Sequence, residues 1–140
     1  MKRTVLLIVI IFGSIFTVNV IAEEKKPSAK VMVDLSPNKP VQKLFPLTLL
    51  SINGDSVIHR NDMIMLEPAK YHLKFYANID LNYFIEGDRI LKSKINQRKY
   101  QDSLDLEVEA GHVYQLGFDA SSVKAEEWRP VLLSATVSNK

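Results

Sequence analysis

The sequence predicts an all-β protein, an antiparallel β-sandwich of immunoglobulin-like or similar type, with about seven to eight short strands and one short helix near the C-terminus. Short apolar runs recur at close spacing from residue 30 onward. Several of them alternate apolar and polar residues, which is the period of a half-buried strand. Clusters of Gly, Pro, Asn and Asp separate these runs and supply the turns between strands.

The first 22 residues have the order of a secretory signal peptide. Lys2 and Arg3 precede an apolar stretch from Val5 to Phe16, and Val20 and Ala22 occupy the −3 and −1 positions of a cleavage site. An uncleaved membrane anchor is the alternative, since the apolar character continues almost to Ala22 and a spanning helix needs only about 20 residues. Polar residues in the second half of the stretch favour cleavage.

Cleavage after residue 22 defines three parts: a signal peptide at 1–22, a flexible leader at 23–29 and a β-sandwich domain at 30–140. The chain has no cysteine. A signal peptide on a domain without disulfides is usual in a bacterial envelope and unusual among small secreted eukaryotic domains. We therefore expect a periplasmic or secreted bacterial protein with no membrane span after cleavage.

The charge balance excludes some partners. Of the 18 basic residues, the signal peptide contains Lys2 and Arg3, so 16 basic residues remain against 16 acidic ones. Binders of nucleic acid or of anionic membranes carry a clearly basic balance. Recognition of a charged partner therefore requires a local patch.

The first strands are predicted at residues 30–35, 47–52 and 63–66. The dipeptide Asn53-Gly54 is the strongest signal of a two-residue hairpin turn, so residues 56–60 should pair with 47–52. Residues 71–77 (YHLKFYA) then alternate, with Tyr71, Leu73 and Phe75 on the core side. His72 and Tyr76 should face outward.

The second half contains the clearest alternation. Residues 104–108 place Leu and Val inward, Ala110-Gly111 makes a turn, and residues 112–118 follow as a second strand. We expect these two strands to form a hairpin. Residues 121–128 (SSVKAEEW) read as the one short helix, with Trp128 covering the end of the sandwich, and residues 131–138 as the last strand. Residues 78–101 allow either a long hairpin followed by a basic loop, or a bulged edge strand and a crossover.

No catalytic or metal motif is present. His59, His72 and His112 lack the spacing of metal ligands. There is no cysteine and no Gly-x-Ser-x-Gly turn to carry a nucleophile. We therefore predict no catalytic residues, no metal, no cofactor and no enzymatic activity.

A local basic run suggests a binding surface. It contains Arg89, Lys92, Lys94, Arg98 and Lys99 without an acidic residue, and aromatic residues flank it. Such a patch suits an anionic partner. The competing and favoured account is an edge strand whose lysines, at 92 and 94 on one face of an extended segment, prevent aggregation. The candidate binding residues are His72, Tyr76, Lys92, Lys94, Arg98 and Lys99.

The segments LSINGDSV, MIMLEPAKYHLKFY and LDLEVEAGHVYQLGF together resemble the small exported β-sandwich proteins of γ-proteobacteria of the YccT kind. PEGA-type surface β domains share a similar hairpin pattern. Ala69 stands where such hairpins usually carry glycine. The resemblance implies a periplasmic or secreted sandwich without an enzymatic site, and it transfers no functional residue.

The leading hypothesis of function is an exported, non-enzymatic β-sandwich that binds another envelope or extracellular component, in the first place a protein. The alternative is a module that binds a small ligand or a glycan, lipopolysaccharide included, through His72, Tyr76 and the basic run. Nucleic acid is not an expected partner.

Overall fold

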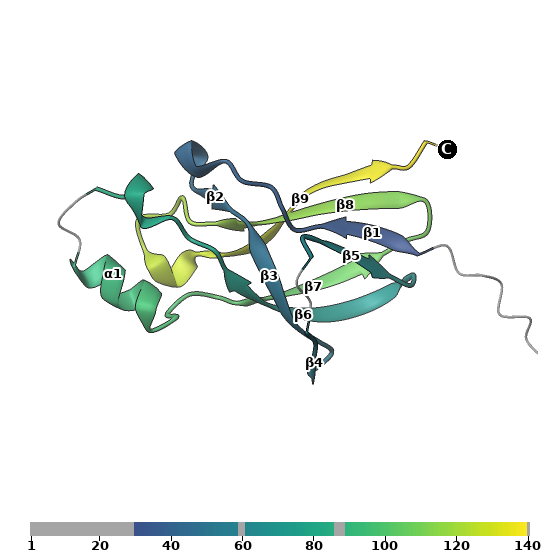
Figure 1. Ribbon diagram of the computed structural model, residues 1–140, viewed down its shortest axis with the longest axis horizontal. Helices are drawn as coiled ribbons and strands as arrows, with labels where there is room; N and C mark the ends of the chain where they lie inside the picture. The colour runs from purple at the N-terminus through teal and green to yellow at the C-terminus, as the bar shows by residue number, and fades with distance from the viewer. Residues whose placement is uncertain (1–29, 59–60, 86–88, 140) are drawn as a thin grey trace, which may run out of the picture.

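The structure is a computed structural model that describes residues 30–58, 61–85 and 89–139. Two β-sheets pack face to face, and one short α-helix lies at one end of them (Figure 1). The predicted all-β sandwich is confirmed. The predicted signal peptide and leader lie outside the described residues.

Sheet A contains five strands and sheet B four. The strands of sheet A are β1 (Val31–Asp34), β2 (Leu44–Phe45), β5 (Met63–Leu66), β8 (His112–Asp119) and β9 (Arg129–Val137). The strands of sheet B are β3 (Leu47–Ile52), β4 (Asp55–Ser56), β6 (Ala69–Ala77) and β7 (Ser103–Val108). The described part of the chain therefore has nine strands, of which β2 and β4 have two residues each.

The helical elements are short. They are the 3-10 turns η1 (Pro40–Gln42), η2 (Leu81–Tyr83) and η3 (Ala125–Glu127), and the α-helix α1 (Arg89–Asn96).

Strand β8 is the centre of sheet A. Its whole length pairs antiparallel with β9 on one edge. Because a strand has only two edges, β1 and β2 must share the other edge in tandem, β1 running parallel to β8 and β2 antiparallel. Strand β5 lies outside β1. Sheet B has the order β4-β3-β6-β7 with every pair antiparallel.

The core lies between the sheets and is built by alternation along each strand. Leu73 and Phe75 of β6 are buried, so their predicted inward placement is confirmed, and Leu116 and Phe118 of β8 are buried opposite them in the core. Trp128 is also fully buried, and its indole N–H donates to the carbonyl of Ser122 at 2.7 Å. No charged or polar residue among those described is buried, so burial of apolar surface holds the sheets together.

The Asn53-Gly54 hairpin between β3 and β4 is confirmed. Asn53 has φ 50° and Gly54 φ 86°, the positive values that such a turn requires. The second strand is shorter than predicted: it covers only Asp55–Ser56, and residues 59–60 lie outside the described part.

The predicted hairpin of residues 104–118 is wrong. Strand β7 pairs with β6 in sheet B, whereas β8 pairs within sheet A. The turn at Ala110-Gly111 is therefore a corner between sheets, and the Glu109 N–H fastens it by donating to the Tyr114 hydroxyl at 2.9 Å. Alternation identifies a strand and its inner face, but it does not say which neighbour the strand pairs with.

The predicted helix is also misplaced. Residues 121–128 form only the single turn η3, and Trp128 already has an extended backbone. The α-helix lies instead within residues 78–101, at Arg89–Asn96. An amphipathic stretch this short fits the period of either element, so the pattern alone did not decide.

Candidate functional site

The outward side chains of β6 form the centre of the candidate site. Because Leu73 and Phe75 point into the core, His72, Lys74 and Tyr76 must project from the opposite surface of sheet B. All three are exposed, as was predicted for His72 and Tyr76. We call this surface, together with the side chains of β3 and β7 that flank it, the β6 face.

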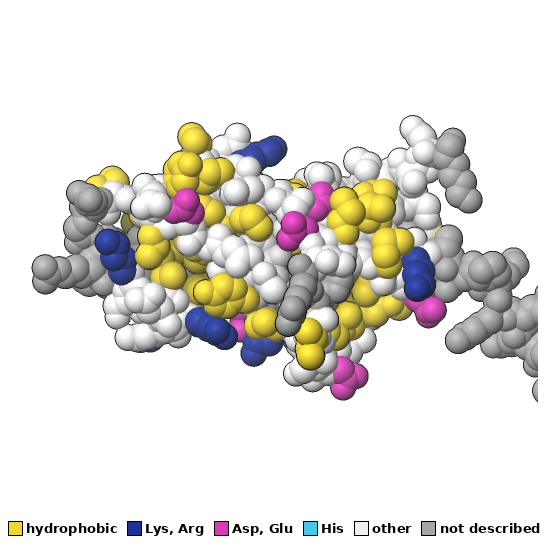
Figure 2. All heavy atoms as spheres, in the orientation of Figure 1, with side chains coloured by type: hydrophobic (Ala, Val, Ile, Leu, Met, Phe, Trp, Pro, Cys, Tyr) yellow, Lys and Arg dark blue, Asp and Glu magenta, His cyan; other side chains and the backbone are white. Residues whose placement is uncertain are grey.

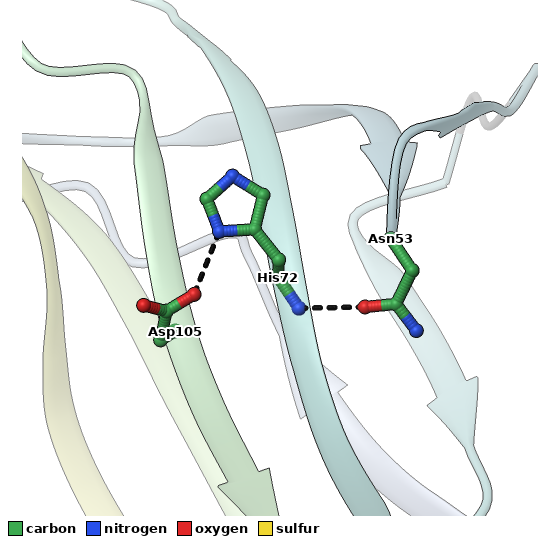
Figure 3. A network of polar contacts seen from close by, with 3 residues as sticks. All are labelled: Asn53, His72 and Asp105. Atoms are coloured by element: carbon green, nitrogen blue, oxygen red, sulfur yellow. Dashed lines mark hydrogen bonds and ion pairs between the residues drawn. The ribbon is translucent and has the colours of Figure 1, made fainter.

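His72 is held on one side by β7 and on the other by the turn between β3 and β4 (Figure 3). Its Nδ1 lies 2.6 Å from Oδ1 of Asp105, which stands directly opposite on β7. Its backbone N–H donates to Oδ1 of Asn53 at 2.8 Å. A carboxylate oxygen accepts, so Nδ1 carries the proton of this bond. The other ring nitrogen, Nε2, points away from Asp105 and is available to a ligand (Figure 3).

Two further ion pairs cross from β6 toward β7. Lys70 Nζ lies 4.0 Å from Glu107 Oε2, and Lys74 Nζ lies 3.5 Å from Asp102 Oδ2. Exposed pairs of this kind contribute about 0–1 kcal/mol each, because water screens them. Lys74 can therefore turn to an anionic ligand at small cost.

Arg98 reaches the same face from the end of α1. The Lys99 N–H donates to the Lys94 carbonyl at 2.8 Å and the Arg98 N–H donates to the Ile95 carbonyl at 2.9 Å, which is the hydrogen-bond pattern of a Schellman cap. Arg98 has φ 53° at the position where glycine is usual. Its guanidinium lies over the ring of Tyr76, 5.0 Å from the centroid.

Two hollows adjoin His72 on the β6 face. The first has a volume of about 480 Å³ and is lined by residues of β6 and β7, with Lys70 balanced by Glu107 and His72 by Asp105. The second has a volume of about 450 Å³. We call it the basic hollow, because its polar side chains are Ser51, Ser56, His72, Lys74 and Arg98, with no carboxylate.

The remaining predicted residues lie elsewhere. Lys94 Nζ contacts Oε1 of Glu126 at 2.6 Å, and this bond from Lys94 lowers the pKa of the Glu126 carboxyl below its ordinary value. Lys92 and Lys99 are exposed but do not line the basic hollow. Of the six predicted residues, the structure brings together His72, Tyr76 and Arg98.

The edge-strand account of the basic run is wrong, because this run forms α1 and its cap. Lys92 and Lys94 are two residues apart in a helix and so do not share a face. The prediction that Lys92 and Lys94 share one face of an extended edge strand therefore does not apply to this segment.

Sequence reasoning missed five members of the site: Asn53, Lys74, Asp105, and the hydroxyl residues Ser51 and Ser56. Each of the first three carried a signal of position, Asn53 as a turn residue and the other two as outward residues of alternating strands. Their meeting depends on the register of β6 against β3 and β7, which places His72 opposite Asp105 and Lys74 opposite Ser51.

The three histidines are not brought together in the part of the chain that is described. His72 lies in sheet B and His112 in sheet A, while His59 falls outside the described residues. Within the described ranges, no three His, Cys, Asp or Glu side chains are grouped closely enough to hold a metal ion. None of the helices in those ranges is long and apolar enough to cross a membrane.

Comparisons with models of protein families, with curated proteins and with solved structures gave no match to this chain.

Proposed function

We propose that this protein is an exported β-sandwich that binds an anionic carbohydrate in the basic hollow of the β6 face. One observation carries the proposal: Lys74 and Arg98, from two separate elements, line one hollow whose own lining has no carboxylate, and the exposed pair of Lys74 with Asp102 is given up at small cost. Their convergence favours a ligand with negative charge.

Each group suits part of such a ligand. The guanidinium of Arg98 lies over the ring of Tyr76, and its N–H donors can form paired hydrogen bonds to a carboxylate or sulfate group. His72 Nε2 and the hydroxyls of Ser51 and Ser56 can exchange hydrogen bonds with sugar hydroxyls. The volume of about 450 Å³ is in the usual range of small-ligand sites.

The conformation of Arg98 supports a role in binding. A non-glycine residue in the left-handed region costs about 1–2 kcal/mol, and such residues concentrate at functional sites. Glycine would satisfy the cap without this cost, but it would supply no cation to the hollow.

Binding fits the geometry better than catalysis. A serine nucleophile needs a hydrogen bond to its general base. In the described contacts His72 bonds through its ring to Asp105, and no bond joins it to Ser51 or Ser56.

The substitution Arg98→Gly separates binding from stability. It removes the cation of the hollow and relieves the strained backbone, so we expect affinity for a uronic acid trisaccharide to fall at least about tenfold while the free energy of unfolding stays equal or rises. Titration calorimetry and urea unfolding measure the two quantities. Lys92→Gln removes an equally exposed charge outside the hollow and should leave both unchanged.

The choice of ligand is tested in the same titration. We expect the uronic acid trisaccharide to bind, its affinity to decrease with added salt, and the matching neutral trisaccharide not to bind. Equal binding of the neutral sugar, or tighter binding of a glutamate peptide of the same charge, would overturn the carbohydrate assignment.

A second candidate function is association with another polypeptide, the leading hypothesis from the sequence. Strand β9 favours it, because among the described strands β9 pairs with β8 alone and leaves its other edge open. An open strand edge binds another extended chain through backbone hydrogen bonds.

A further inference from the structure

Strand β9 borders sheet A and runs to the C-terminal end of the molecule (Figure 1). The part next to Arg129 is covered on its outer side, since the Gln101 N–H donates to the Trp128 carbonyl at 2.9 Å. A bulge follows, where the register against β8 shifts between Ser134 and Leu132. Beyond it, Ser134–Val137 form a regular ladder with β8 on one edge only.

The open edge of β9 lacks the protection that the other edges have. Exposed edges are commonly protected by shortness, charge or proline. Strand β4 has only two residues, β5 has a carboxylate at each end, Asp62 and Glu67, and β7 carries Asp105 and Glu107. No charged residue occurs between Val131 and Asn139. The bulge protects the first half of β9, but the ladder after it is unprotected.

This half of β9 also leaves apolar side chains exposed. Ala135 and Val137 stand opposite the inward-facing row of β8, yet Val137 is 68% exposed and Ala135 is exposed as well. Leu132, at the bulge, is 46% exposed. Sheet B therefore does not cover sheet A at this edge. On the other side of β8, away from β9, hydrophobic side chains gather over β1 and β5 (Figure 2).

We propose that β9 pairs edge to edge and antiparallel with β9 of a second copy of the chain, which joins two sheets A into one continuous sheet. The open backbone groups require an extended strand as the partner. An uncharged edge is complementary to itself, because self-pairing opposes no like charges. Residues 23–140 contain 16 basic and 16 acidic residues, so no net repulsion separates two copies.

The register that centres on Thr136 fits the alternation. If Thr136 stands opposite Thr136 of the partner subunit, then Ala135 faces Val137 of the partner subunit on the core side of the sheet. Residues directly opposite each other then lie on the same face, as a regular ladder demands. The pairing is isologous and uses both open edges, so it closes at a dimer and does not continue as a fibre.

Sedimentation equilibrium of the protein from residue 23 onward tests the pairing. We expect a dimer that dissociates on dilution and that Val137→Lys reduces to a monomer, because the lysines place like charges across the new ladder. Val123→Lys is the matched control: Val123 is 98% exposed but lies away from β9, so its variant should remain dimeric. A monomeric mass up to about 1 mM protein, or a Val137→Lys dimer, overturns the proposal.

Disulfide trapping tests the register, since the natural chain has no cysteine. Under oxidising conditions, Thr136→Cys should form a covalent dimer at least about tenfold faster than Val123→Cys at the same concentration, because paired strands hold the two sulfurs within bonding distance. Equal rates for the two variants contradict pairing at this register.

Discussion

At the scale of the residue, Asn53 links the turn to the candidate site. Its positive φ helps to form the β3–β4 turn. Its side-chain Oδ1 also accepts from the His72 N–H, and its own N–H donates to the His72 carbonyl, both at 2.8 Å. The tip of this hairpin is therefore fastened to β6 at the residue that adjoins both hollows.

Substitutions at Asn53 should resolve these two contributions. Asn53→Gly keeps the positive φ but removes the side-chain acceptor, which should lower the free energy of unfolding by about 1 kcal/mol. Asn53→Ala loses the acceptor and adds the cost of a left-handed alanine, so we expect a further loss of about 1 kcal/mol. Urea unfolding of both variants measures the difference, and equal stabilities would show that backbone strain contributes nothing.

The sequence predicted some site residues because their position depends on local alternation alone. Leu73 and Phe75 lie between His72 and Tyr76 in the sequence and are apolar. Because side chains alternate along a strand, His72 and Tyr76 must face outward. The meeting of Arg98 with Tyr76 does not follow from any spacing, because it depends on a helix cap that sets the direction of Arg98. Long-range register determines which outward residues become neighbours.

At the scale of the element, α1 is fastened to η3 by one ion pair. Lys94 bonds to Glu126, and this bond lowers the pKa of the Glu126 carboxyl below its ordinary 4.5. A lowered carboxyl pKa means that the pair contributes stability above about pH 4.5, and that this contribution is lost as pH falls through the lowered pKa. The docking of α1 should therefore weaken in acid before the sandwich itself unfolds.

Removal of the Lys94 amine should reverse this shift. In Lys94→Gln, the pKa of Glu126 should rise toward the ordinary value, because the shorter, uncharged amide replaces the hydrogen bond from the Lys94 ammonium and removes its charge. Lys99→Gln should raise it less, since Lys99 acts only by a weaker charge interaction. NMR titration of the Glu126 carboxyl measures all three proteins, and an unchanged midpoint in Lys94→Gln would contradict the assigned cause.

At the scale of the whole molecule, the pairing of strands is mostly non-local. Strand β1 pairs with β8, although most of the sequence lies between these two strands. Strands β7 and β8 are separated by only a short turn, yet they lie in different sheets. The fold class followed from strand length and alternation, which depend on local residues. The partners of each strand did not, because they depend on which apolar faces fit together in the core.

Folding should be slow for a chain of this size. Loops must close before the β1–β8 pairing gains any contact, so we expect refolding in milliseconds to seconds, as in other non-local β proteins. Stopped-flow fluorescence of the buried Trp128 would follow the formation of the core. Refolding faster than about a millisecond would contradict the non-local topology.

The place of β1 in the middle of sheet A has a consequence for biosynthesis. Strand β1 is the first described strand of the chain, but its parallel neighbour β8 ends at Asp119. A chain that emerges N-terminus first, from a ribosome or from a translocation channel, presents β1 with one bare edge until more than 80 further residues have followed, as the positions of Asp34 and Asp119 require. During that interval Val31 and Val33 have no complete core to enter, so their apolar side chains stay exposed to association with other chains until β8 arrives.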